Sequence, residues 1–168
     1  SRFKYTPIEG LDYNDFDGTI SRRDSSKIIR ANDQFYVYYT RRNTETPPAP
    51  AHGPDRGTEG ATETIPSRDW DLSQIYYSTS KDGFTWTEQG VAVPNPPKPA
   101  PGWRSVSTPD ILVWKNKYYL YYQAYTDIPG QLGGDFCPVS VAVSDSPDGP
   151  FIPSQNVILE NGPEGAWD

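Results

Sequence analysis

Two aspartates stand at corresponding places in two similar stretches of the chain. Asp24 precedes a strand-like run that leads to Phe35–Tyr39, and Asp110 precedes the run that leads to Tyr118–Tyr122. Two carboxyl groups can cleave a glycosidic bond, because one activates water or attacks carbon while the other protonates the leaving oxygen. The repeat therefore makes Asp24 and Asp110 candidate catalytic residues, with Asp24 as general base.

Both aspartates also have an ordinary structural interpretation. Asp24 follows Arg22-Arg23, whose charges would keep its carboxyl ionised for base catalysis. Aspartate is equally a common turn former, and the Pro109-Asp110 pair is ordinary turn chemistry. The two interpretations carry equal weight for either residue alone. The repetition of an acid at matching places favours catalysis.

The elements that must position these acids are predicted to be two blades of a β-propeller. Each stretch contains four short strand signals, and repeated four-stranded units are typical of propellers. The aromatic content of 14%, with 18 Pro and 14 Gly between the runs, also favours an all-β fold. Each acid would begin an innermost strand, so that both would face one central site. The strand signals fall at 27–31, 35–42, 73–79, 84–87, 111–114, 118–126, 138–144 and 151–152.

The predicted organisation is a lead-in over 1–23, a first blade over 24–93 and a second blade over 107–160. The first blade carries an insertion over 43–70, and loops of that length are usually functional or disordered. We expect the insertion to fold over a binding site, although a solvent-exposed loop is nearly as consistent with its sequence. Two blades cannot close a ring, so we expect a piece of a longer protein.

Other side chains could contact a sugar. His52, the one histidine, could hydrogen-bond sugar hydroxyls, although a plain surface position is slightly better supported. Trp103, in a loop before Asp110, is an even choice between a sugar-stacking face and a structural role. Trp86 and Trp114 lie in strand patterns and are predicted to pack in the core.

The composition limits the classes of molecule that the chain is expected to bind. The net charge is −7 and no basic cluster is larger than an arginine pair, which argues against nucleic acid and against anionic membrane surfaces. No apolar run is long enough to span a membrane, and no signal peptide is visible, although a leader could precede residue 1. The lone Cys137 cannot form an internal disulfide. The cytoplasm and the periplasm both stay open, with the cytoplasm slightly favoured.

Metal binding has weak support in the sequence. Asp15 and Asp17 have a spacing similar to that of a calcium loop, but the remaining ligands are missing and a solvated turn is the better interpretation. We therefore predict no metal ligands.

The chain resembles the amino-terminal part of glycoside hydrolase family 117. The resemblance rests on residues 10–15 leading into 21–24, on the long stretch 51–64 and on 107–110. It implies a five-bladed propeller with exo-acting α-1,3-(3,6-anhydro)-L-galactosidase activity. Such an enzyme releases 3,6-anhydro-L-galactose from neoagarobiose and short neoagaro-oligosaccharides of agar, with inversion.

The resemblance also implies roles for individual residues and partners. Asp24 would be the base, and Asp110 would hold the place of the acid that orients the site and adjusts its partner's pKa. The resemblance places the general acid in a later blade, beyond Asp168. Glu164 invites comparison with a catalytic glutamate, but it is better interpreted as a loop residue. The remaining blades of the same protein, a homodimer at full length and a divalent cation near the site are further expectations. We expect substrate contacts from Arg23, His52, Trp103, Thr108 and Gln123.

Two alternatives remain at this point. The first is a related propeller glycosidase that acts on another sugar, such as arabinan or fructan. The second is a carbohydrate-binding propeller without catalysis, in which the acids only hydrogen-bond hydroxyl groups.

Overall fold

The computed structural model of the chain describes residues 17–49, 60–128 and 131–163, and every regular element in these ranges is a β-strand. This confirms the all-β prediction. No helix in these ranges is long and apolar enough to cross a lipid bilayer. The strands are β1 (Ile20–Arg23), β2 (Ile29–Ala31), β3 (Gln34–Asn43), β4 (Ser73–Ser80), β5 (Thr87–Val93), β6 (Ser105–Trp114), β7 (Lys117–Ile128), β8 (Gln131–Phe136), β9 (Val139–Ser144) and β10 (Ile152–Pro153).

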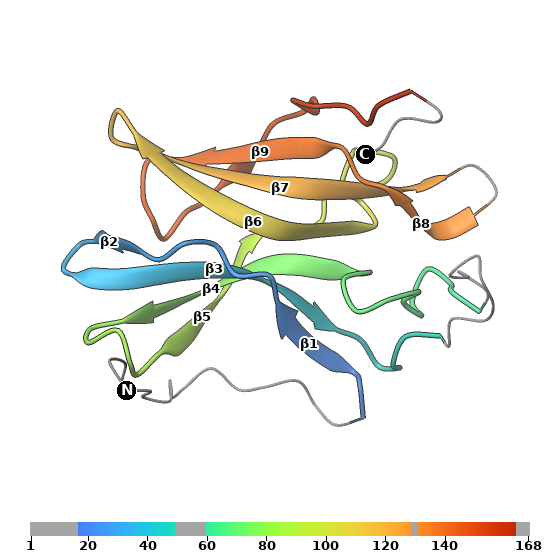
Figure 1. Cartoon of the computed structure of the whole chain (residues 1–168), viewed down its shortest axis with the longest axis horizontal. Coiled ribbons are helices and arrows are strands. Elements are labelled where there is room, and N and C mark those ends of the chain that lie inside the picture. The colour runs from blue at the N-terminus through green and yellow to red at the C-terminus, as the bar shows by residue number, and fades with distance from the viewer. Residues whose placement is uncertain (1–16, 50–59, 129–130, 164–168) are drawn as a thin grey trace, which may run out of the picture.

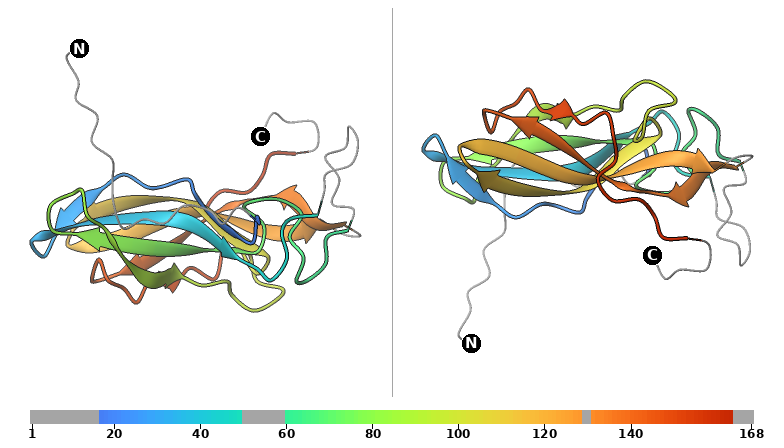
Figure 2. Two further views of the ribbon diagram at one scale, coloured as in Figure 1. Left: turned by 90° about the horizontal axis from the view of Figure 1, so that it is seen from below. Right: turned by 90° about the horizontal axis from the view of Figure 1, so that it is seen from above.

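The strands form two antiparallel sheets with the same order, which accounts for the repeat in the sequence (Figure 1). The first sheet runs β1-β3-β4-β5, and β2 pairs with the other end of β3. The second runs β6-β7-β9-β10, and β8 pairs with the end of β7. Figure 2 shows β8 at the same end of the molecule as residues 60–72, which lead into β4.

Tight hairpin turns lead into β3 and β7, the second strand in the order of each sheet. Asn32-Asp33 joins β2 to β3 with φ values of 48° and 56°, and Lys115-Asn116 joins β6 to β7 with 48° and 59°. Positive φ at both central residues is the geometry of a type I′ hairpin, which asparagine and aspartate favour. The second turn lies one residue before the predicted pair Asn116-Lys117.

Several strands differ from their predicted bounds. β1 lies inside the predicted lead-in, because its sequence Ile-Ser-Arg-Arg has no apolar alternation and its strand is fixed by pairing with β3. β6 begins at Ser105 rather than at 111, β5 covers Thr87–Val93 rather than 84–87, and β8 has no predicted counterpart. Asp24 consequently lies in an interruption between β1 and β2, not at the start of a strand.

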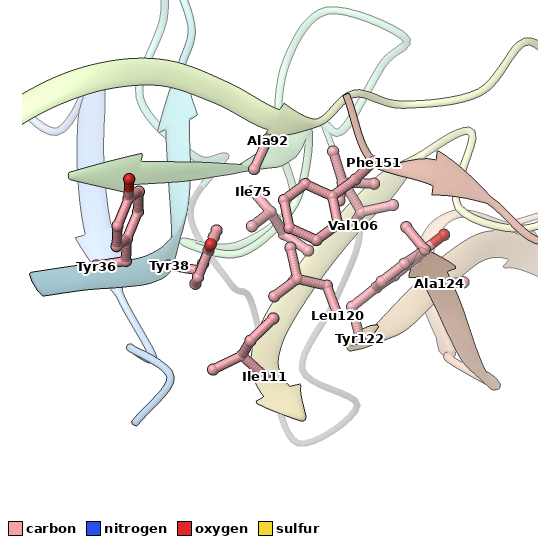
Figure 3. Close-up of a cluster of buried hydrophobic side chains, with 12 residues drawn as sticks. Tyr36, Tyr38, Ile75, Ala92, Val106, Ile111, Leu120, Tyr122, Ala124 and Phe151 are labelled. Carbon is pink, nitrogen blue, oxygen red and sulfur yellow. The ribbon is translucent and has the colours of Figure 1, made fainter. Parts of the chain in front are cut away.

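A continuous apolar core lies between the two sheets (Figure 3). Phe151 of the second sheet meets Tyr38 of the first edge-on, with ring centroids 5.6 Å apart. The Tyr38 hydroxyl also donates a hydrogen bond of 2.6 Å to the Pro147 carbonyl. Each large side chain buried here contributes about 1.5–3 kcal/mol, so the sheets are held as one body. The buried members are Tyr36, Tyr38, Ile75, Ala92, Val93, Val106, Ile111, Leu120, Tyr122, Ala124, Ala142 and Phe151.

The two strand tryptophans have different environments. Trp86 is only 3% exposed and packs with Val37 and Tyr39, as predicted for a core residue. The prediction of core packing for Trp114 is wrong, because its side chain is 55% exposed and lies under Lys115, whose Nζ is 4.2 Å from the ring centroid. Trp114 ends β6 beside a hairpin turn, where the second sheet extends beyond the inter-sheet core.

Candidate active site

Asp24 lies in the interruption of the first sheet's edge strand, with a φ of 50°. The Ser26 amide donates to the Tyr38 carbonyl (2.7 Å), and the Tyr38 amide donates to Ser26 Oγ (3.1 Å). These bonds hold the interrupted segment against β3 while the Asp24 carboxyl stays outside the ladder. Arg23 Nε donates a hydrogen bond of 2.8 Å to Asp24 Oδ2.

Arg22 does not join this pair, contrary to the expectation that both arginines would flank Asp24. Its Nε lies 3.0 Å from Glu88 Oε2 on β5. Successive residues of a strand point to opposite faces, so only Arg23 can share a face with the site.

Thr108 occupies the place in the second sheet that Asp24 occupies in the first. In the first sheet Arg23 is paired with Thr40, which is the seventh residue after the hairpin turn at 32–33. In the second sheet Ser107 is paired with Gln123, which is the seventh residue after the turn at 115–116. The residue that follows each paired position, Asp24 or Thr108, has a φ of 50°.

The expectation that Asp110 matches Asp24 in position is therefore corrected. Asp110 is paired with Tyr121 and lies two residues further along β6 than Thr108. The short bulge at Thr108-Pro109 is the reason for the shift, because it inserts residues into β6 that have no partner on β7.

The two edge strands nevertheless meet at one junction. The Thr108 amide donates a hydrogen bond of 2.8 Å to Thr40 Oγ1, and Thr40 is the ladder partner of Arg23. Lys27, three residues after Asp24, places its Nζ 2.7 Å from Asp110 Oδ2. Asp110 thus lies at the contact between the first and second sheets, and Asp24 lies three residues before the lysine that binds Asp110.

Contacts at the junction lower the pKa of Asp110. Partial burial alone would raise the pKa of its carboxyl, but the Lys27 hydrogen bond and charge, with the Ile111 amide, lower the pKa below its ordinary value. Asp110 is therefore ionised at neutral pH. It suits an electrostatic or orienting role and not that of a proton donor.

A polar group from the second sheet continues the site. Thr108 Oγ1 donates to Gln123 Oε1 (2.9 Å), and the Tyr125 hydroxyl donates to the same oxygen (3.2 Å). The structure therefore brings together two of the predicted substrate contacts, Thr108 and Gln123, and adds Tyr125.

The end of the insertion also reaches this region. Trp70 lies between the two sheets, because the Arg23 guanidinium is 5.6 Å from its ring centroid and the Tyr125 ring centroid is 6.5 Å away. Arg68 approaches the same indole at 5.1 Å, and Asp69 Oδ2 lies 4.0 Å from Arg23 Nη1. An aromatic face flanked by charged and hydroxyl groups can bind a sugar ring and its hydroxyls.

Two of the predicted contacts are not part of this group. Trp103 packs with Lys98 of the Pro-rich connection, with Nζ 4.2 Å from the ring centroid, and the geometry does not join it to the carboxylates. His52 lies outside the described residues, as do Asp15 and Glu164.

Sequence reasoning missed the partners that come from distant segments. Lys27 is 83 residues from Asp110, and no local pattern marks it. Arg104, a buried residue that bonds the insertion, likewise lies in a loop without a motif. Asp69 is marked in the sequence only as a polar residue at the end of the insertion. Trp70 is one of five tryptophans that could each supply a sugar-stacking face, and nothing in the sequence distinguishes it from the others.

The described residues do not fit the divalent cation that the resemblance implies. They contain no group of three or more His, Cys, Asp or Glu side chains that could hold a metal ion. Asp17 instead accepts hydrogen bonds at Oδ1 from the Thr19 amide (2.9 Å) and hydroxyl (2.8 Å), as in an ordinary turn. We therefore derive no chemical step through a metal.

Comparison with solved structures first defines the class of fold. RS223 β-xylosidase matches 82% of the chain at 23% identity and a TM-score of 0.57, over 36% of its own length. CoXyl43, a family 43 β-xylosidase/α-arabinofuranosidase from a compost microbial metagenome, matches 89% of the chain at 24% identity and a TM-score of 0.59, over 39% of its length. The chain is thus about two blades of a β-propeller of the kind found in glycoside hydrolases.

A third structure defines the family. Zg3597, a family 117 glycoside hydrolase of the marine bacterium Zobellia galactanivorans, is 55% identical over 98% of this chain, with a TM-score of 0.84. The chain belongs to glycoside hydrolase family 117. It spans about half (47%) of the length of that relative. No protein-family model and no curated protein sequence matches the chain.

Proposed function

We propose that this chain supplies two blades of a five-bladed glycosidase that releases 3,6-anhydro-L-galactose from neoagarobiose and short neoagaro-oligosaccharides, with inversion. The observation that carries the proposal is the junction of the two blades, where Arg23 binds Asp24, Lys27 binds the ionised Asp110 and the Thr108 amide binds Thr40. The 55% identity to a family 117 enzyme supports glycoside hydrolysis as the reaction.

Asp24 is the water-activating base in this mechanism. Arg23 binds Oδ2, so Oδ1 can accept a proton from a water that attacks the anomeric carbon. In an inverting enzyme the water lies between the base and the sugar, and an acid on the opposite side protonates the leaving oxygen. That acid would come from the remaining blades of the protein.

Asp110 orients the substrate and stabilises the positive charge that develops on the sugar ring. Its pKa lies below the ordinary value, so it remains a carboxylate as the oxocarbenium-like transition state forms. Thr108 and Gln123 are proposed to bind sugar hydroxyls. Trp70 is proposed as an aromatic wall of the same site, and His52 and Trp103 stay proposed substrate contacts.

Product analysis tests the proposal against its alternatives. The full-length protein is incubated with neoagarobiose, with short neoagaro-oligosaccharides and with arabinan- and fructan-type oligosaccharides, and the products are separated by chromatography. Release of 3,6-anhydro-L-galactose with an inverted anomeric configuration by NMR is expected. Turnover of only an arabinan or fructan substrate supports the second glycosidase, whereas saturable binding without any product supports a carbohydrate-binding propeller.

We further propose that the full-length protein is a homodimer that acts in the cytoplasm on sugars taken up by the cell. Light scattering coupled to gel filtration measures the mass of the full-length protein. Fractionation of the producing cells assigns the compartment, and a periplasmic fraction containing the enzyme would contradict the second part.

A further inference from the structure

A buried ion pair joins the end of the insertion to the second blade. Arg104, which immediately precedes β6, is 1% exposed, and Asp71, which closes the insertion, is 3% exposed. Arg104 Nε donates to Asp71 Oδ1 (2.7 Å) and Nη2 donates to Oδ2 (2.5 Å). This bidentate geometry fixes the direction of both side chains and not only their separation.

Both charged groups are satisfied by further hydrogen bonds from the insertion. Arg104 Nη1 donates to the Thr62 carbonyl (2.6 Å) and Nη2 to the Ile65 carbonyl (3.4 Å). Asp71 Oδ2 accepts from the Ser67 amide (2.7 Å) and hydroxyl (2.9 Å). A buried pair is costly to desolvate and is a weak source of stability, so its value here lies in the arrangement that it imposes.

The arrangement reaches Trp70, the residue before Asp71. The Trp70 carbonyl accepts hydrogen bonds from the Ser73 hydroxyl (2.6 Å) and from the hydroxyl of Ser105, the neighbour of Arg104. The backbone on both sides of Trp70 is therefore attached to the beginning of β6. The same strand carries Thr108 and Asp110 a few residues later, so the indole and the carboxylate share one support.

We propose that Arg104 and Asp71 act as a positioning pair that fixes Trp70 as the aromatic wall of the sugar site beside Arg23 and Asp24. The inference rests on the proposed function for the identity of the ligand. Neither Arg104 nor Asp71 contacts the sugar. They act through Trp70, whose indole loses its fixed direction when the bidentate contact is lost.

The test compares Arg104→Lys, Asp71→Asn and Trp70→Ala in the full-length protein with neoagarobiose as substrate. Arg104→Lys keeps the positive charge but loses the forked pair of donors, and Asp71→Asn keeps the shape of the side chain but loses the negative charge. Two variants are used so that the test still stands if one of them fails to fold. We expect each of the three substitutions to raise KM about tenfold, equivalent to about 1.4 kcal/mol, and to change kcat much less. Adding Arg104→Lys to Trp70→Ala should raise KM no further. Lys117→Gln, which breaks the exposed pair with Asp145, is the matched control and should leave both constants unchanged.

A second measurement needs no sugar. Acrylamide quenching of the Trp70 fluorescence, taken as the difference from Trp70→Phe, is expected to increase in Arg104→Lys because the indole becomes more accessible. Unchanged quenching in a folded Arg104→Lys variant overturns the positioning role, as does a KM increase that adds fully to that of Trp70→Ala. Absence of neoagarobiose turnover by the unmodified protein contradicts the proposed function instead, and the quenching result then decides the positioning role alone.

Discussion

The edge strand of each blade is interrupted at a corresponding place, but by different residues. In the first blade, residues 24–28 lie opposite residues 37–39, so the strand is interrupted and begins again. In the second, residues 108–109 lie opposite residue 122, so the strand only bulges. The two interruptions start at the same place with the same backbone angle, but one begins with an acid and the other with a threonine.

This difference gives the two carboxylates unlike surroundings. Asp24 is bound by its neighbour Arg23 within one blade, whereas Asp110 is bound by Lys27 from the adjacent blade. A strict repeat would have given both acids the same partner and the same role. The unequal interruptions are consistent with the proposed division of roles, in which Asp24 is the base and Asp110 a fixed negative charge.

The largest effect is expected from Asp24→Asn. Loss of a general base lowers turnover roughly a thousandfold, while neoagarobiose binding stays nearly intact because the amide keeps the shape of the side chain. Initial rates and calorimetric binding on the full-length protein measure the two quantities. Asp33→Asn, an exposed acid in the hairpin turn of the same blade, is the control. Retained turnover in Asp24→Asn would reject its role.

The junction itself is tested by Thr40→Val. Thr40 is fully buried and its hydroxyl accepts the hydrogen bond from the Thr108 amide, so valine of similar shape leaves that amide unpaired. We expect a loss of about 1–3 kcal/mol in the free energy of unfolding, measured by urea denaturation. Thr87→Val, at an exposed position of β5, should change stability far less. Equal stability of both variants would mean that the bond does not hold the blades together.

A smaller effect on catalysis is expected from Asp110→Asn. Removal of one charge that acts on the reacting groups changes the transition-state energy by about the equivalent of one pKa unit, or tenfold in kcat. A loss as large as that of Asp24→Asn would show that the two acids share the catalytic step and would contradict the distinction between the blades.

The subtlest effect concerns pH. The carboxylate of Asp110 contributes to catalysis only while it is ionised. Because its pKa is lowered, this contribution is present above that pKa and is lost as the pH falls through it. Lys27→Met removes the main cause of the lowering, so the acidic limb of the kcat profile should move to higher pH. Lys117→Met, which affects a pair remote from the site, should leave the limb in place. A shift to lower pH in Lys27→Met would contradict the assigned contact.

The sequence predicted features that depend on neighbouring residues. The strand repeat and the turn residues established the two sheets, and the pattern around Trp86 placed it in the core. Features that depend on the register between paired strands could not be predicted from the sequence. The match between Asp24 and Asp110 fails because a bulge cannot be read from residue types, and β1 was missed because pairing with β3, not its own composition, makes it a strand.

Contacts between distant segments were the least predictable. The Arg104–Asp71 pair spans 33 residues and the Lys27–Asp110 pair spans 83, and nothing in the sequence links either residue to its partner. Such pairs form only when the sheets stack, so their chemistry belongs to the assembled core and not to a local sequence.

The most direct test of the shared site is a crystal structure of the full-length Asp24→Asn protein with neoagarobiose bound. We expect the sugar at the junction of the two blades, with its reacting carbon facing residue 24 across one water and its hydroxyls within reach of Asp110. A sugar bound away from residue 24, or one that leaves residues 24 and 110 facing separate surfaces, would contradict it.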